Sequence, residues 1–287
     1  MRALGSSGLR KTLALPACAL VVFALAVPVI QLLLISFTKL SATATDTHLP
    51  FGNYLQFGSD WYYASIAVRT LWMAVTATVI SALLAFPFAV CVWQLPPRLK
   101  LIVTLLALSP MLVSIVVRAY GWIVILGDTG VINRMLLATG VVNQPLHMMF
   151  TDGAMLLGFV YVEFPFMVLA ILSSLERIPR EIVEAARTLG ASPLRAIAEV
   201  ILPLAAPGII AGSTIVFSLC MTAFVTPLLM GGSGAKVLTT LIYQQFVVSF
   251  NWPLGAVGAA LLLILSIGVV AIFTVVTNRA TRPSLRQ

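Results

Sequence analysis

The chain has 287 residues, of which 60% are hydrophobic and 9% are charged, and its mean hydropathy is +1.07. Soluble domains contain roughly 45–50% apolar residues, so this composition excludes an ordinary soluble domain and indicates a polytopic membrane protein. The net charge of +8 comes from basic residues near the ends of apolar segments, a pattern typical of topology signals rather than of a nucleic-acid surface. We therefore expect a lipid bilayer, and no nucleic acid, among the partners.

Six apolar windows are long enough to cross a bilayer as helices, which takes about 20 residues each. They cover residues 12–37, 66–94, 101–126, 153–175, 204–230 and 253–277. The first window is longer than the apolar part of a secretory signal, so we interpret it as a retained helix. The sequence thus predicts an all-α fold, a polytopic membrane helix bundle with six transmembrane helices, forming one domain over residues 1–287.

The basic residues predict how this bundle is oriented. With the amino terminus inside, 12 of the 17 Lys and Arg residues lie in cytoplasmic segments. Such an excess is typical of the cytoplasmic side, so both termini are predicted to be cytoplasmic. On the opposite side, residues 127–151 are too polar for the bilayer and predict an outer cap made of a helix and a loop.

One charged segment interrupts the apolar windows; we call residues 176–203 the charged loop. Eight charged side chains lie between Glu176 and Glu199, although the whole chain has only 17 basic and nine acidic residues. A membrane protein that concentrates its charge in one cytoplasmic loop presents a docking surface there. An amphipathic loop lying on anionic lipid is the alternative, but the interspersed acidic residues disfavour it.

Within the charged loop, the pattern predicts two short helices. The first begins after Pro179, with acidic residues in its first turn that complement the helix dipole, and Gly190 ends it. Ser192 and Pro193 are a typical cap and first residue for the second helix, which we expect to end near Leu202-Pro203. On the first helix, small alanines form a flat strip with polar residues at its edge: Glu184, Ala185, Ala186 and Arg187.

The spacing within this loop extends to a longer motif. Its residues are Glu184-Ala185-Ala186, then Gly190 after three residues, then Val200-Ile201-Leu202-Pro203 after nine more. This motif resembles the EAA loop in the permease subunits of binding-protein-dependent ABC importers, although that family prefers isoleucine where Val200 stands. From about residue 50 onward, further stretches are similar to the spermidine/putrescine permease branch: 165–169, 173–176, 189–192, 207–212 and 252–256.

The resemblance implies a type I ABC importer permease fold in a bacterial inner membrane. The chain would pair with a second permease subunit, two ATPase subunits would receive the coupling loops, and a periplasmic substrate-binding protein would deliver the solute. The ATPase-coupling residues would be Glu184, Ala185, Ala186, Arg187 and Gly190. The partner ATPase would bind ATP and Mg²⁺, so we expect no cofactor in this chain. The glycine-rich residues 231–236 lack the spacing of a phosphate-binding loop.

Two groups of side chains are candidates for the substrate pathway. Glu163 is the acidic residue placed deep within a predicted span, and an intramembrane ionisable residue is by default a hypothesis of function. Beside it, Tyr161 offers an aromatic face to a cationic amine. An internal ion pair of Glu163 with Arg118 or Arg69 is the alternative. Arg118, Tyr120 and Trp122 form the second group, near the outer end of the third window, and an anionic solute would favour the arginines.

Residues for catalysis are sparse. His48 and His147 fall in outer segments without a matching nucleophile or acid, and the three cysteines, Cys18, Cys91 and Cys220, show no CxxC pair, so neither a disulfide nor a metal site is expected. The sequence therefore does not predict an enzyme, and the resemblance implies a permease that imports polyamines or a related small cationic solute. The alternatives are a sibling importer branch for an opine, thiamine or ferric iron, and a membrane scaffold that transports nothing.

Overall fold

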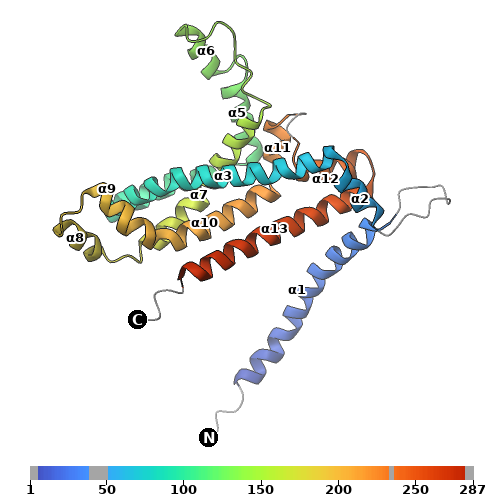
Figure 1. Cartoon of the computed structure of the whole chain (residues 1–287), viewed down its shortest axis with the longest axis horizontal. Coiled ribbons are helices and arrows are strands. Elements are labelled where there is room, and N and C mark those ends of the chain that lie inside the picture. The colour runs from blue at the N-terminus through green and yellow to red at the C-terminus, as the bar shows by residue number, and fades with distance from the viewer. Residues whose placement is uncertain (1–5, 39–50, 233–235, 282–287) are drawn as a thin grey trace, which may run out of the picture. The chain divides into compact units, whose positions relative to one another are not determined.

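The structure, a computed structural model, describes residues 6–38, 51–232 and 236–281, and all regular secondary structure in these ranges is helical (Figure 1). Six helical segments of the described residues are long and apolar enough to cross a membrane: Cys18–Ser36, Trp61–Gln94, Ile115–Ala138, Asp152–Leu175, Pro193–Thr222 and Trp252–Val275. The predicted all-α architecture with six spans is confirmed.

The helices have the following bounds in chain order: α1 (Ser6–Ser36), α2 (Gly52–Ser59), α3 (Trp61–Gln94), α4 (Pro97–Leu112), α5 (Ile115–Leu126), α6 (Val131–Ala138), α7 (Asp152–Leu175), α8 (Arg180–Thr188), α9 (Pro193–Ala196), the π-helical η1 (Ile197–Ile201), α10 (Leu202–Thr222), α11 (Val225–Met230), α12 (Leu238–Tyr243), the π-helical η2 (Gln244–Val248) and α13 (Trp252–Thr281).

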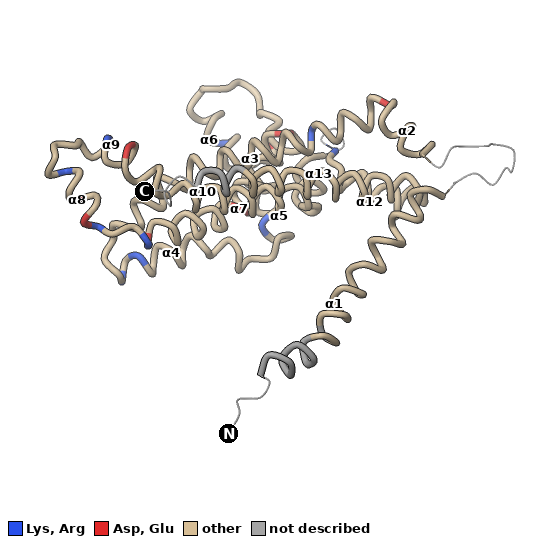
Figure 2. Tube along the Cα trace, turned by 60° about the horizontal axis from the view of Figure 1, so that its bottom comes forward, with Lys and Arg blue, Asp and Glu red and all other residues tan. Residues whose placement is uncertain are grey.

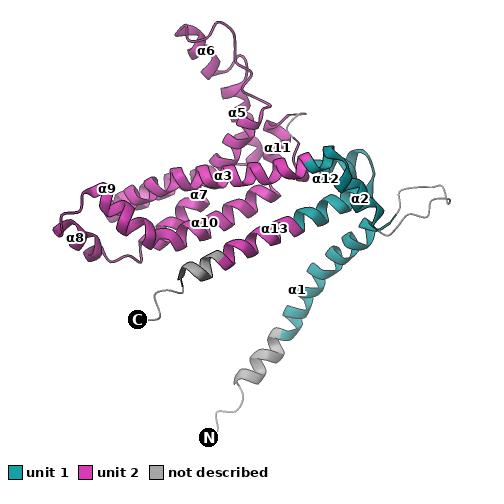
Figure 3. Ribbon diagram, in the orientation of Figure 1, with its two compact units in different colours: residues 1–64, 241–263 teal, residues 65–240, 264–287 magenta. Residues whose placement is uncertain are grey.

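The chain divides into two compact units (Figure 3). One comprises Met1–Ala64 and Leu241–Leu263, and the other comprises Ser65–Thr240 and Ile264–Gln287. Helices α3 and α13 each contribute residues to both units. The single permease domain expected from the sequence stays a prediction.

In the first unit, α2 is bonded to the end of α1. The side-chain amide of Asn53 donates hydrogen bonds to the carbonyl oxygens of Ser36 at 2.8 Å and Thr38 at 2.9 Å. The hydroxyls of Ser36 and Tyr54 lie 2.8 Å apart. A helix end leaves its last carbonyls without partners, so Asn53 fixes the position where α1 ends.

In the second unit, α7 packs closely against α10 because two glycines face α7. A Cβ atom added to Gly208 would lie 2.7 Å from the carbonyl oxygen of Ala170, and one added to Gly212 would lie 2.7 Å from Sδ of Met167. Small residues let membrane helices approach closely. The large side chains buried on these two helices include Phe159, Met167 and Ile171 of α7 and Phe217 and Met221 of α10.

Two predicted windows are each divided into two helices by a break in the backbone. Between α4 and α5, Val113 and Ser114 are extended, with ψ of 136° and 135°. Between α10 and α11, Ala223 is extended, and its carbonyl oxygen accepts a hydrogen bond of 2.8 Å from the Thr239 hydroxyl. Pro227 lies in the first turn of α11, where a proline needs no N–H partner. Such breaks survive at membrane depth where protein or cavity water satisfies the backbone.

The second short helix of the charged loop also differs from its predicted end. Helix α9 continues through η1 directly into α10, so the chain stays helical from Pro193 to Thr222. Leu202 N–H bonds to the Ile197 carbonyl in the π-helical turn just before Pro203. Pro203 follows this turn inside the continuous helix, where it lacks the N–H that would donate a helical hydrogen bond.

Residues 127–151 contain the short helix α6 and a loop, but the candidate span Ile115–Ala138 includes α6, so the outer cap stays a prediction. Asn133 on α6 is completely buried and makes three hydrogen bonds. Its amide donates to the carbonyl oxygens of Gly127 and Leu146, both at 3.0 Å, and its oxygen accepts from the Leu146 N–H at 2.8 Å. Asn133 therefore joins the two ends of this segment. His147 also pairs here, through Nδ1, with Asp128 Oδ1 at 3.0 Å.

Candidate functional site

The first helix of the charged loop, α8, has the boundaries that the sequence predicts. It begins after Pro179 and ends at a Schellman motif. Gly190 has a positive φ of 90°, its N–H bonds to the Arg187 carbonyl at 2.9 Å, and the Ala191 N–H bonds to the Ala186 carbonyl at 3.1 Å. A residue other than glycine adopts this φ only with strain, so Gly190 sets the direction in which the chain leaves α8.

The cap of the second helix is confirmed as well. The Ser192 hydroxyl accepts a hydrogen bond of 3.3 Å from the Arg195 N–H, and Pro193 is the first residue of α9. One turn later, Arg195 Nε donates to both carboxylate oxygens of Glu199, at 2.9 and 3.0 Å. These bonds lie within the loop, so the turn between α8 and α9 is defined by local contacts.

The predicted coupling residues lie on the surface of α8 and its turn. Glu184, Ala185, Arg187 and Gly190 are exposed, and Ala186 is half-buried. The structure adds two residues that the sequence analysis missed. Leu189 is 89% exposed and Leu194 is 79% exposed, on either side of the turn between the helices. The sequence could have pointed to these two leucines through their position next to the turn at Gly190. Two nearly bare leucines favour a partner that covers them.

The charged loop contacts the end of α3 and the start of α4, which the sequence predicts to lie on the same side of the membrane. Charged residues gather at α8, α9 and the start of α4 (Figure 2). Lys100 Nζ lies 2.5 Å from Glu176 Oε1. Arg180 donates through Nη2 to the Trp93 carbonyl at 3.3 Å, and its guanidinium lies 5.8 Å from the centre of the Trp93 ring.

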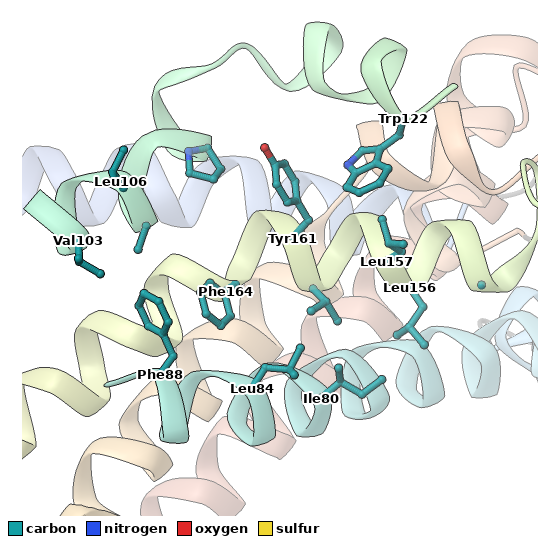
Figure 4. A pocket seen from close by; sticks show the side chains of 14 residues that line it. Ile80, Leu84, Phe88, Val103, Leu106, Trp122, Leu156, Leu157, Tyr161 and Phe164 are labelled. Carbon is teal, nitrogen blue, oxygen red and sulfur yellow. The ribbon is translucent and has the colours of Figure 1, made fainter. Parts of the chain in front are cut away.

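A separate cavity of about 820 Å³ lies between α3, α4, α5 and α7 (Figure 4). Its lining is almost entirely apolar and includes four aromatic rings in two edge-to-face pairs. Trp122 and Tyr161 have ring centres 5.4 Å apart, and Phe88 and Phe164 have ring centres 5.5 Å apart. The structure thus brings together two of the predicted pathway residues, Trp122 and Tyr161.

The other predicted pathway residues do not line this cavity. Tyr120 is 59% exposed, whereas Glu163 is only 5% exposed. The buried atoms Glu163 Oε2 and Arg118 Nε have no hydrogen-bond partner among the described residues. Arg69 pairs with Asp152 at 4.0 Å. Arg118 lies close enough to act electrostatically on Glu163, so the internal ion pair considered from the sequence stays open beside the pathway role.

Solved structures share this fold. One permease chain of a bacterial ABC transporter that imports the acidic polysaccharide alginate superposes with a TM-score of 0.80 over 96% of both chains, at 17% sequence identity. A chain of the MetNI methionine ABC transporter in an inward-facing conformation superposes with a TM-score of 0.56, over 78% of this chain and all of that chain, at 18% identity. The fold is that of type I ABC importer permeases.

Sequence relatives identify the family. The spermidine/putrescine transport system permease protein PotB of Escherichia coli K12 is 35% identical over 78% of this chain and 80% of its own length. PotB of Haemophilus influenzae is 35% identical over 68% of both chains. The family described as "Binding-protein-dependent transport system inner membrane component" matches residues 3–282. The chain therefore belongs to this family and is a multi-pass inner-membrane permease of an ABC importer.

Proposed function

We propose that this permease forms part of an ATP-driven importer that moves polyamines, such as putrescine and spermidine, or a related small cationic solute, by alternating access. The observation that carries the solute assignment is the 35% identity to PotB over 78% of the chain. The permease does not hydrolyse ATP in this proposal. A separate ATPase binds ATP and Mg²⁺, and the chain itself holds no cofactor.

Helix α8 and its turn are the proposed docking surface for the ATPase. The alanine strip lets a partner backbone approach, and Glu184 and Arg187 at its edge offer directional polar contacts. Leu189 and Leu194 are the proposed apolar anchors, since buried anchors in partner pockets carry much of the energy of an interface. The assembly has a second permease subunit, two ATPase subunits and a periplasmic substrate-binding protein, with both termini of this chain in the cytoplasm.

The two helix breaks support an alternating-access cycle. Transporter sites are typically formed where spanning helices are discontinuous, and short extended segments can absorb changes in backbone angle. In this chain the breaks lie at Val113–Ser114 and at Ala223. ATP binding can drive the cycle only if the ATPase interacts differently with the two states, and α8 is where we place that difference.

The proposed solute path passes the predicted pathway residues. Trp122 and Tyr161 line the aromatic cavity, and in the proposal an ammonium group gains cation–π attraction from their rings. Tyr120 and Arg118 lie on the same helix as Trp122, α5. Glu163 provides the negative charge, from a buried position on α7.

Uptake of radiolabelled putrescine and spermidine tests this function, in vesicles that contain both permeases, the ATPase and the binding protein. Glu184→Lys is expected to abolish uptake and detach the ATPase while the permease stays inserted. Glu181→Lys is the matched control and is expected to retain uptake, since Glu181 is another exposed acidic residue of α8 but not one of the coupling residues.

The outcomes separate the alternatives. Transport of another solute but of neither polyamine contradicts the polyamine assignment and leaves the importer intact. A wild-type complex that binds the ATPase but moves no solute favours a scaffold. Equal uptake by Glu184→Lys and wild type contradicts the assignment of α8 as the docking surface.

A further inference from the structure

The carboxyl end of α3 receives a hydrogen bond from a residue far along the chain. A helix leaves its last carbonyls without intrahelical partners, and a cation is favoured there. Helix α3 has no basic residue in its own last turn. Arg180, 87 positions after Trp93, donates to the Trp93 carbonyl at 3.3 Å. Arg180 therefore caps α3 from outside that helix.

A second interaction fixes the geometry of this cap. The Arg180 guanidinium lies 5.8 Å from the centre of the Trp93 ring, within cation–π range, and Trp93 is only 7% exposed. The same two residues thus share a hydrogen bond, a helix-dipole interaction and a ring contact. Arginine suits all three because its guanidinium is planar, permanently charged and rich in donors, whereas a lysine ammonium offers only a point charge.

The space around this contact is not filled. A cavity of about 320 Å³ lies between Trp93 and Gln94 at the end of α3 and residues of α8, α9 and η1. Its lining on α8 includes Val183, Glu184 and Arg187. Side chains on opposite sides of a void make no contact across it. The Arg180–Trp93 contact therefore bridges α8 and α3 at the edge of a gap.

We propose that Arg180 is a positioning residue that connects the coupling helix α8 to the transmembrane helix α3, so that a displacement of α8 by the ATPase moves α3. Arg180 is the first residue of α8, and the exposed coupling residues lie on the turns that follow it. This inference rests on the proposed function, because it assigns a route for the force that docking at α8 delivers. The ion pair between Lys100 and Glu176 is a second polar link, which joins the start of the charged loop to α4.

The test uses the complete importer in vesicles and measures solute transported per ATP hydrolysed. The variants are Arg180→Gln, Arg180→Lys and Trp93→Leu. Arg98→Gln is the matched control, because Arg98 is an exposed arginine on α4, outside the charged loop. Co-purification of the ATPase is measured for every variant.

The expected result is uncoupling with the complex assembled. Arg180→Gln and Trp93→Leu retain the ATPase and hydrolyse ATP, but the solute moved per ATP falls about fivefold or more. The solute moved per ATP in Arg180→Lys lies between the values for Arg180→Gln and wild type. The double variant Arg180→Gln with Trp93→Leu transports no less per ATP than either single variant, because both substitutions remove the same contact. Arg98→Gln resembles wild type. An unchanged ratio in both single variants overturns the proposal, and so does loss of ATPase binding in Arg180→Gln alone.

A readout that needs no solute separates this inference from the proposed function. Spin labels attached to Gln94→Cys and Thr188→Cys, in a chain whose native cysteines are replaced, report the distance between α3 and α8. Arg180→Gln is expected to broaden the distance distribution, and Arg98→Gln is expected to leave it unchanged. A narrow distance distribution in Arg180→Gln overturns the connection even if solute uptake falls. Broadening without any polyamine uptake contradicts only the solute assignment.

Discussion

Lys100 Nζ lies 2.5 Å from Glu176 Oε1, so the first turn of α4 is joined to the first residue of the charged loop. Lys100 is 25% exposed and Glu176 is 51% exposed in their side chains. Partly exposed ion pairs contribute modestly, and salt screens them. The link therefore orients the loop more than it stabilises the fold.

A double-mutant cycle measures this link. Lys100→Met, Glu176→Gln and the double variant are compared by thermal unfolding of the purified permease, and the coupling free energy is expected to be about 0.2–1 kcal/mol. The coupling is expected to decrease at high ionic strength. A coupling free energy that is independent of salt would contradict the electrostatic origin of the contact.

Gly190→Ala is expected to weaken ATPase binding by disturbing the end of α8. A Cβ at Gly190 would meet no atom within 4 Å, so the cost is purely conformational, at the positive φ of 90°. A left-handed conformation costs a residue other than glycine about 1–2 kcal/mol. The measurement is ATPase co-purification with the permease.

Gly268→Ala is the matched control for Gly190→Ala. A Cβ at Gly268 also meets nothing within 4 Å, but Gly268 lies inside α13 without a positive φ. Alanine has the higher helix propensity there, so this variant is expected to retain ATPase binding and full stability. Equal loss of ATPase binding in Gly190→Ala and Gly268→Ala would show that the positive φ of Gly190 is not the cause of the loss.

The packing of α10 against α7 predicts different effects at two glycines. At Gly208, an added Cβ would lie 2.7 Å from the carbonyl oxygen of Ala170, which belongs to the backbone of α7 and cannot move alone. At Gly212, the nearest atom is Sδ of Met167, in a flexible side chain. Gly208→Ala is expected to lower the free energy of unfolding by about 1–3 kcal/mol, and Gly212→Ala by less. Thermal unfolding tests the order, and the reverse order would contradict the helix contact.

Asn133→Ala is expected to unfold the segment between α5 and α7 locally. The substitution removes three hydrogen bonds and leaves the carbonyls of Gly127 and Leu146 without the amide donor. Each lost hydrogen bond contributes about 0.5–1.5 kcal/mol. Faster proteolysis within residues 127–151 is the readout. Asn143→Ala, at an exposed position of the same loop, is expected to leave the rate unchanged.

Local signals explain which parts of the fold the sequence predicts. The ends of α8 and the cap of α9 follow from proline, glycine and serine chemistry within a few residues, and the structure agrees at Gly190 and Ser192. The break at Val113–Ser114 does not follow from local chemistry, because these residues are compatible with an apolar helix. The contact between Arg180 and Trp93 joins positions that only the tertiary fold brings together.

Glu163→Gln is expected to raise the KM for spermidine about tenfold or more, which is the size of a lost hydrogen bond to a charged group. Glu163 is 5% exposed, and its Oε2 has no hydrogen-bond partner among the described residues. A buried carboxylate without a partner is costly, so we expect an ammonium group of the solute to supply that partner during transport.

Uptake at varied spermidine concentrations measures this effect, with thermal unfolding as the parallel readout. Glu163→Asp keeps the charge and is expected to recover part of the affinity, while Trp122→Leu removes a ring face and raises KM by a smaller factor. An unchanged KM together with a lower unfolding temperature in Glu163→Gln would place Glu163 in the packing of α7 instead. Glutamine preserves the shape of the side chain but replaces a charged acceptor oxygen with an NH₂ donor, so a change confined to KM reports the lost charge and the lost acceptor.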